Sequence, residues 1–187
     1  MDAFIASTLL VALAEIGDKT QLLSFVLAAR LRRPWAIIAG ILVATLANHA
    51  LAGWVGTLIA EFSSPETMRW VTGIVFIAFG LWTLKPDELD DDDAPKNTSA
   101  GAFVTTTIAF FIAEMGDKTQ FATIALAAKY DALVWVVAGT TLEKLAANVP
   151  AVLIGEKLAH RLPLKQIRWA AAAVFAATGV LTLAGIA

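Results

Sequence analysis

The chain contains no cysteine and few charged residues. Its 187 residues include 14 Lys and Arg, 16 Asp and Glu and 2 His, so charged residues make up 16%, against about 25% in an average soluble protein. Without cysteine the chain has no disulfides, thiolate metal ligands or cysteine nucleophiles, which leaves oxygen and imidazole as the possible ligands for a metal. The formal net charge of −2 provides no basic surface for nucleic acid.

The amino terminus also lacks the basic segment and the small-residue cleavage site of a signal peptide. Met1, Asp2 and Ala3 lead directly into an apolar run. We therefore expect this run to be the first membrane span rather than a leader that is removed.

Hydrophobic residues are abundant, at 58% of the chain with a mean hydropathy of +0.72. A helix needs about 20 apolar residues to cross roughly 30 Å of hydrocarbon, and six blocks satisfy this once a few internal polar residues are allowed. The blocks lie at 3–30, 35–60, 68–85, 102–129, 132–157 and 166–186. The sequence thus predicts an all-α polytopic membrane protein with six transmembrane helices.

An internal repeat divides the chain, because the segment from Phe4 to Leu84 aligns without a gap with the segment 99 positions later. It pairs the motif Glu-x-Gly-Asp-Lys-Thr-Gln at 15–21 with the same motif at 114–120. Each copy holds three spans, an odd number, so the second copy must enter the membrane from the opposite side. We predict two inverted-topology three-helix repeats, at 1–85 and 102–187, joined by an acidic linker at 86–101.

Lys and Arg residues are distributed unequally between the two sides of this six-helix arrangement. Nine lie on one side, two on the other and three inside the spans. Because cytoplasmic loops are enriched in Lys and Arg, the side with nine is expected to face the cytoplasm. This places the linker in the cytoplasm and both termini outside.

The two copies of the motif lie at the centres of the first and fourth blocks, near the bilayer midplane. A carboxylate there costs at least about 2.5–3.5 kcal/mol, so such residues are usually functional. On a continuous helix Glu15 and Asp18 are three residues apart and share a face, as do Glu114 and Asp117. When the repeats meet, we expect the four carboxylates to form one site.

Four carboxylates with nearby amide oxygens form a hard ligand set, which suits Ca²⁺, Mn²⁺ or Mg²⁺ better than Zn²⁺ or Cu⁺. The predicted metal site comprises Glu15, Asp18, Glu114 and Asp117, with Asn48, Asn148, Gln21 and Gln120 as further ligands or supports. Gly17 and Gly116 permit a local helix break that turns carbonyl groups toward an ion. Crowded carboxylates that release a metal take up protons, which predicts metal/proton exchange.

Simpler explanations exist for several of these residues. Each motif carboxylate can form a structural ion pair with the adjacent lysine, although duplication at mid-membrane argues against this. These lysines, Lys19 and Lys118, are instead expected to balance excess carboxylate charge when no metal is bound. Gln21 and Gln120 can hydrogen bond between helices without touching an ion. His49 is expected to satisfy hydrogen bonds rather than bind metal, and Glu143 and Lys144 are expected to form a local ion pair.

Paired Glu-x-Gly-Asp-Lys-Thr motifs, each opening a three-helix repeat, resemble the family of Golgi manganese/calcium transporters and bacterial manganese exporters. The resemblance covers essentially the whole chain, including the segment 147–152 around Asn148. It implies export of Mn²⁺, with Ca²⁺ as a second possible substrate, in exchange for protons across the bacterial inner membrane. Glu15, Asp18, Glu114 and Asp117 correspond to the metal ligands of that family, and neither an enzymatic activity nor a resident cofactor is expected.

Three other functions are compatible with a small polytopic chain. An exporter of small organic solutes such as amino acids would share the topology but needs at most one carboxylate pair. An intramembrane metal-dependent hydrolase would need a nucleophile or a His-containing metal set, and the motif has no His. A channel is disfavoured because tightly coordinating carboxylates at one central site slow conduction.

Overall fold

The computed structural model describes residues 1–15, 18–85, 100–154 and 164–186, and every regular element in these ranges is a helix. In chain order the described helices are α1 (Asp2–Glu15), α2 (Lys19–Leu31), α3 (Pro34–Glu61), α4 (Pro65–Thr83), α5 (Ala102–Glu114), α6 (Lys118–Tyr130), α7 (Leu133–Ile154) and α8 (Leu164–Leu183). The helices α3, α4, α7 and α8 correspond to the second, third, fifth and sixth predicted blocks. The end of the fifth block and nearly all of the predicted linker lie outside the described residues.

The first and fourth predicted blocks each consist of two helices rather than one. In the second half, α5 ends at Glu114, Gly116 has φ +76°, and Asp117 is the N-cap of α6. A positive φ is strained for any residue with a Cβ, so the predicted break at Gly116 is confirmed. The first half also ends a helix at Glu15 and begins the next after Asp18, while Gly17 lies outside the described residues.

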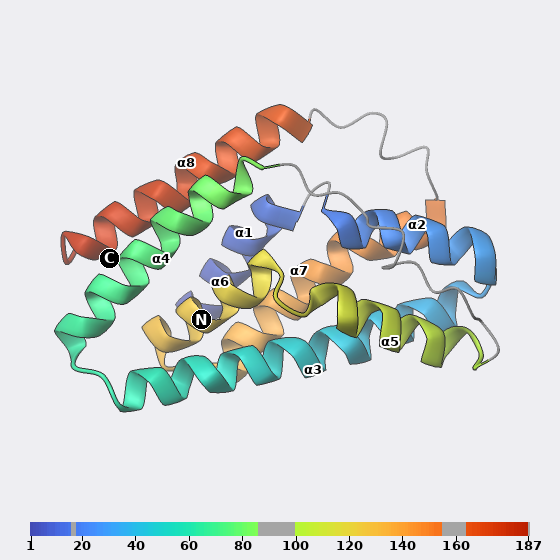
Figure 1. The fold of residues 1–187 in the computed structure, drawn as a ribbon, viewed down its shortest axis with the longest axis horizontal. Helices are drawn as coiled ribbons and strands as arrows, with labels where there is room; N and C mark the ends of the chain where they lie inside the picture. The colour runs from blue at the N-terminus through green and yellow to red at the C-terminus, as the bar shows by residue number, and fades with distance from the viewer. Residues whose placement is uncertain (16–17, 86–99, 155–163, 187) are drawn as a thin grey trace.

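Each broken pair of helices runs along the long helix of the other half. A Cβ on Gly40 of α3 would lie 2.9 Å from the Phe103 carbonyl oxygen of α5, and one on Gly139 of α7 would lie 2.7 Å from the Phe4 carbonyl oxygen of α1. These two contacts are related by the 99-residue offset. The halves are therefore interlocked, with α5 and α6 following α3 and with α1 and α2 following α7 (Figure 1).

The last helices of the two halves, α4 and α8, lie side by side in opposite directions at one end of the molecule (Figure 1). Phe76 of α4 contacts Phe175 of α8, its equivalent in the repeat, with ring centroids 6.2 Å apart. Equivalent positions of the two halves therefore meet across this pair of helices.

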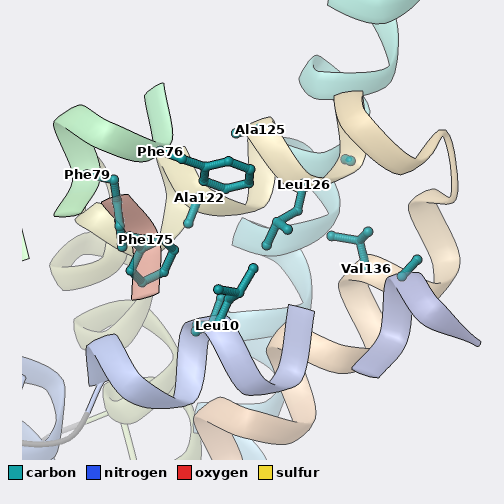
Figure 2. Packing of buried hydrophobic residues seen from close by; sticks show 11 residues of the cluster. Leu10, Phe76, Phe79, Ala122, Ala125, Leu126, Val136 and Phe175 are labelled. Atoms are coloured by element: carbon teal, nitrogen blue, oxygen red, sulfur yellow. The ribbon is translucent and has the colours of Figure 1, made fainter. Parts of the chain in front are cut away.

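Two apolar clusters hold the broken helices in place. The first joins α1 and α6 with α4, α7 and α8, and Figure 2 shows Leu10, Leu126 and Phe175 packing together within it. The second joins α2 and α5 with α3 and α7, and includes Leu23 and Phe110. The leading helix of each broken pair thus packs with the trailing helix of the other, and the breaks fall between the two clusters.

Large apolar side chains are exposed on several helices, outside the two buried clusters. Trp54, Leu81, Ile108 and Ile112 are all more than half exposed, whereas the four motif carboxylates are buried. Exposed large apolar side chains beside buried carboxylates are typical of a protein in a lipid environment. Among the described helices, α3 alone is long and apolar enough to cross a membrane, and three shorter apolar stretches lie in α1, α5 and α8.

Candidate functional site

The helix breaks place two carboxylates in each half at facing helix ends. Glu15 and Glu114 are the last residues of α1 and α5, and the backbone N–H groups of Asp18 and Asp117 donate to their carbonyl oxygens at 3.0 and 3.1 Å. The prediction that each Glu and Asp share one helix face is therefore wrong. A tight turn brings them together instead, because the helix stops at the glutamate and restarts after the aspartate.

Both aspartates occupy the N-cap of the following helix, where a carboxylate is favoured by the helix dipole and the unpaired N–H groups. The Thr20 hydroxyl donates to Asp18 Oδ2 at 3.0 Å, and the Thr119 hydroxyl donates to Asp117 Oδ2 at 3.1 Å. These matched bonds fix the orientation of the two side chains. In the Asp-Lys-Thr part of the motif, the aspartate is thus the N-cap of a helix and the threonine two residues later hydrogen bonds to its carboxylate.

Three of the four carboxylates converge on one point. Oxygen atoms of Glu15, Asp18 and Asp117 all lie within 4.8 Å of one another, and all three residues are buried. This group draws on both halves of the chain, and one cation could contact all three oxygens after a small adjustment. Glu114 is equally buried, at 1% exposed, but it lies outside this group.

Lys144, from the middle of α7, occupies the centre of the carboxylate cluster. Its Nζ donates a hydrogen bond to Glu15 Oε2 and lies 2.8 Å from Glu114 Oε1 and 3.7 Å from Asp18 Oδ2. Lys144 is 0% exposed. The predicted local ion pair with Glu143 is wrong, because adjacent residues on a helix point about 100° apart and Lys144 points toward the breaks.

The predicted amide residues are all close to the breaks, but their oxygens are used differently. Asn148 Oδ1 accepts a hydrogen bond from Ser24 at 2.7 Å, and Gln120 Oε1 accepts one from the Gly116 N–H at 2.8 Å. Gln21 donates to the Ala147 carbonyl, and Asn48 donates to the Phe111 carbonyl at 3.0 Å. Asn48 Oδ1 is buried and accepts no hydrogen bond from the described residues.

Position 49 on α3 corresponds to position 148 on α7 in the repeat, and both residues face the site. His49 is fully buried, and its Nε2 lies 3.6 Å from Glu114 Oε2. This distance is too long for a good hydrogen bond. His49 therefore contributes a polar neighbour to Glu114, whereas its counterpart Asn148 is hydrogen bonded to Ser24.

Comparison with known proteins gives this arrangement its context. Residues 3–91 and 102–186 match the family described as divalent cation/proton antiporter GDT1, so nearly every described residue of both halves is included. The chain belongs to the GDT1 family. The resemblance inferred from the motifs is thereby confirmed, and with it a membrane location and the transport of divalent cations, rather than an enzymatic reaction, as the family activity.

Individual members of the GDT1 family align over most of their length. A protein from Vibrio cholerae named “Putative manganese exporter” is 52% identical over 94% of this chain and 87% of its own. A GDT1-like protein from Synechocystis is 32% identical over 89% of each chain, and GDT1-like protein 5 from Arabidopsis thaliana is 27% identical over 98% and 96%. No solved structure matches the chain.

Lys144 is a residue of this GDT1-family site that sequence reasoning placed outside it, in a local ion pair with Glu143. Two features pointed to it: a lysine in the middle of an apolar helix is expensive unless it has a partner, and the repeat has Thr45 at the equivalent position. Sequence reasoning instead expected Lys19 and Lys118 to balance the carboxylates. The adjacent Glu143 gave the wrong partner for Lys144, because sequence proximity was taken for spatial proximity.

Proposed function

We propose that this GDT1-family chain exports Mn²⁺ from the cytoplasm in exchange for protons, through a carboxylate site at the membrane midplane. The observation that carries the proposal is the convergence of buried Glu15, Asp18 and Asp117 at two facing helix breaks. Mn²⁺ is preferred as the substrate because the relative at 52% identity is named for manganese. Ca²⁺ is the second candidate substrate because it binds the same hard oxygen ligands.

Glu15, Asp18 and Asp117 are the proposed first ligands, and Glu114 adds a fourth negative charge beside them. Asn48 supplies the most suitable additional oxygen, because its Oδ1 accepts no hydrogen bond from the described residues. Asn148, Gln21 and Gln120 act mainly as supports, since each makes a hydrogen bond that fixes a helix break or its neighbour. Protons compete with the metal for the same carboxylate oxygens, which supplies the coupling.

The proposed topology has six spans in two inverted repeats, with α1–α2 and α5–α6 each forming one broken span. The packing of α1 with α6 and of α2 with α5 supports this, because inverted repeats place the leading half of one broken span beside the trailing half of the other. The excess of Lys and Arg on one side supports a cytoplasmic linker with both termini outside.

Purified protein in liposomes provides the test, with Mn²⁺ flux and internal pH recorded together. A pH gradient should drive Mn²⁺ uphill, and Mn²⁺ flux should move protons in the opposite direction. Glu15→Gln and Asp117→Asn should lose both activities, whereas Asp131→Asn should retain them because Asp131 is exposed and far along α6 from the break. Lysine flux without metal flux would establish the organic-solute alternative, and Mn²⁺ flux without proton movement would exclude exchange.

Substrate choice is tested in the same liposomes by competition. Excess Ca²⁺ should reduce Mn²⁺ flux if both ions use the site, and Mn²⁺ binding should weaken as the pH falls because protons occupy the oxygens that the metal needs. Mn²⁺ binding that does not change between neutral and mildly acidic pH would contradict coupling through these carboxylates.

A further inference from the structure

Lys144 contacts the same oxygen-bearing groups that would bind the transported ion. Its Nζ bonds to Glu15 and lies 3.7 Å from Asp18 Oδ2, and both residues belong to the three-carboxylate group. An ammonium and a dication placed together among these oxygens would repel each other strongly, because the site is fully buried and poorly screened. Lys144 must therefore leave Glu15 and Asp18 when a metal binds there.

We infer that Lys144 is a tethered cation that fills the transport site when no ion is bound and that a substrate must displace. This inference rests on the proposed function, because it assigns a competitor to the same carboxylate site. The displaced ammonium keeps one partner, since Glu114 Oε1 lies 2.8 Å from it and Glu114 is outside the three-carboxylate group. Lys144 thus needs to move only its flexible side chain.

The surrounding structure restricts the motion to that side chain. The Asn148 side chain donates to the Lys144 carbonyl at 2.9 Å and accepts from Ser24 of α2 at 2.7 Å. These two bonds tie the α7 backbone to the helix that begins at Asp18. The ammonium can therefore exchange partners while its own Cα stays fixed relative to the break.

A tethered ammonium also discriminates between ions by charge. A monovalent ion that displaces Lys144 replaces one positive charge with another and gains little electrostatic energy, whereas a dication brings one additional charge to Glu15, Asp18 and Asp117. Lys144 therefore makes the site selective for dications and lowers its absolute affinity for them. The other half has no such residue at the equivalent position, where the buried Thr45 hydroxyl makes no hydrogen bond to the described residues.

The test measures Mn²⁺ binding to the purified full-length protein by calorimetry, with and without excess Na⁺ or K⁺. Lys144→Met preserves the length of the side chain without its charge, so Mn²⁺ should bind at least about tenfold more tightly and monovalent ions should now compete. Lys144→Arg keeps the charge and should retain the wild-type preference for dications. Unchanged Mn²⁺ affinity in Lys144→Met would overturn the inference. Loss of Mn²⁺ binding in Lys144→Met with normal binding in Lys144→Arg would also overturn it, because the charge would then be needed for binding.

The repeat offers a second test, in which a lysine is added or moved at position 45, the equivalent of position 144. Thr45→Lys in the wild-type background adds a second ammonium and should weaken Mn²⁺ binding by at least about tenfold. The double variant Thr45→Lys with Lys144→Thr moves the tethered cation to the other half and should recover much of the wild-type affinity. Wild-type binding in Thr45→Lys would contradict the inference even if Lys144→Met did not fold.

These outcomes separate the inference from the proposed function. Absence of Mn²⁺ binding and transport in the wild-type protein would overturn the proposed function. Mn²⁺ binding that Glu15→Gln removes but Lys144→Met leaves unchanged would overturn only the role of Lys144.

Discussion

The two halves of the chain place the same carboxylates at the same kind of helix break, but the long helices that face these breaks differ. On α7, Lys144 and Asn148 point into the site, where Lys144 pairs with Glu15 and Asp18 of the first half and Asn148 accepts a hydrogen bond from Ser24. On α3, the equivalent residues are Thr45 and His49, which make no hydrogen bond to the described residues. The repeat thus determines the framework of the site, and departures from the repeat determine its charge balance.

The largest expected effect concerns the two motif glutamates. One charge at about 4 Å is worth about 4 kcal/mol at an effective dielectric constant near 20, so Glu15→Gln should weaken Mn²⁺ binding by more than about a hundredfold. Glu114→Gln should weaken it by only about tenfold, because Glu114 lies outside the three-carboxylate group. Equal losses in calorimetric titrations of the two variants would mean that the halves contribute equally, contrary to the asymmetry described above.

The next effect concerns the close contacts that the two halves share. Gly40→Ala and Gly139→Ala place a Cβ less than 3.0 Å from a carbonyl oxygen of the other half, and overpacking of this kind costs about 1–3 kcal/mol. Both should lower the melting temperature of the detergent-solubilised protein by similar amounts. Ala50→Val, at an exposed position on α3, should melt like the wild type, and a large difference between the two glycine variants would show that the interlocking is not symmetric.

A smaller difference is expected between the two asparagines. Asn148→Ala removes two hydrogen bonds, one to Ser24 and one to the Lys144 carbonyl, whereas Asn48→Ala removes one to the Phe111 carbonyl. A net contribution of about 1 kcal/mol per bond makes Asn148→Ala the less stable variant in thermal melts. Mn²⁺ titration should show the opposite order if Asn48 is a ligand, and a greater loss of affinity in Asn148→Ala would instead make Asn148 the ligand.

The smallest effect concerns the threonines that orient the N-cap aspartates. Thr20→Val and Thr119→Val each remove a hydroxyl bond to Asp18 or Asp117, at a cost of about 0.5–1.5 kcal/mol. Mn²⁺ affinity should therefore fall severalfold, and by the same factor in both halves. Serine at either position restores the hydroxyl and should restore the affinity, and failure to do so would show that the methyl group, not the bond, matters.

Much of the fold could be predicted from the sequence because it depends on local chemistry. Apolar block lengths predicted α3, α4, α7 and α8, and Gly116 with Asp117 predicted a break, since glycine accepts a positive φ and aspartate caps a helix. The same-face argument for Glu15 and Asp18 failed because it assumed a helix that continues through the motif. The convergence of carboxylates from both halves followed from the repeat, whereas the proposal of Mn²⁺ as the substrate rests on a relative named for manganese.

The sequence by itself determined where the apolar segments lie, which residues recur 99 positions later and that four carboxylates lie deep in apolar segments, because periodicity and hydropathy are properties of short stretches. The tertiary structure alone decided that Lys144, not its neighbour or the motif lysines, joins Glu15 and Glu114, and which amide oxygens are already engaged. The direction of a side chain on α7 has meaning only relative to α1 and α2, which are packed against it by contacts more than a hundred residues apart in the chain.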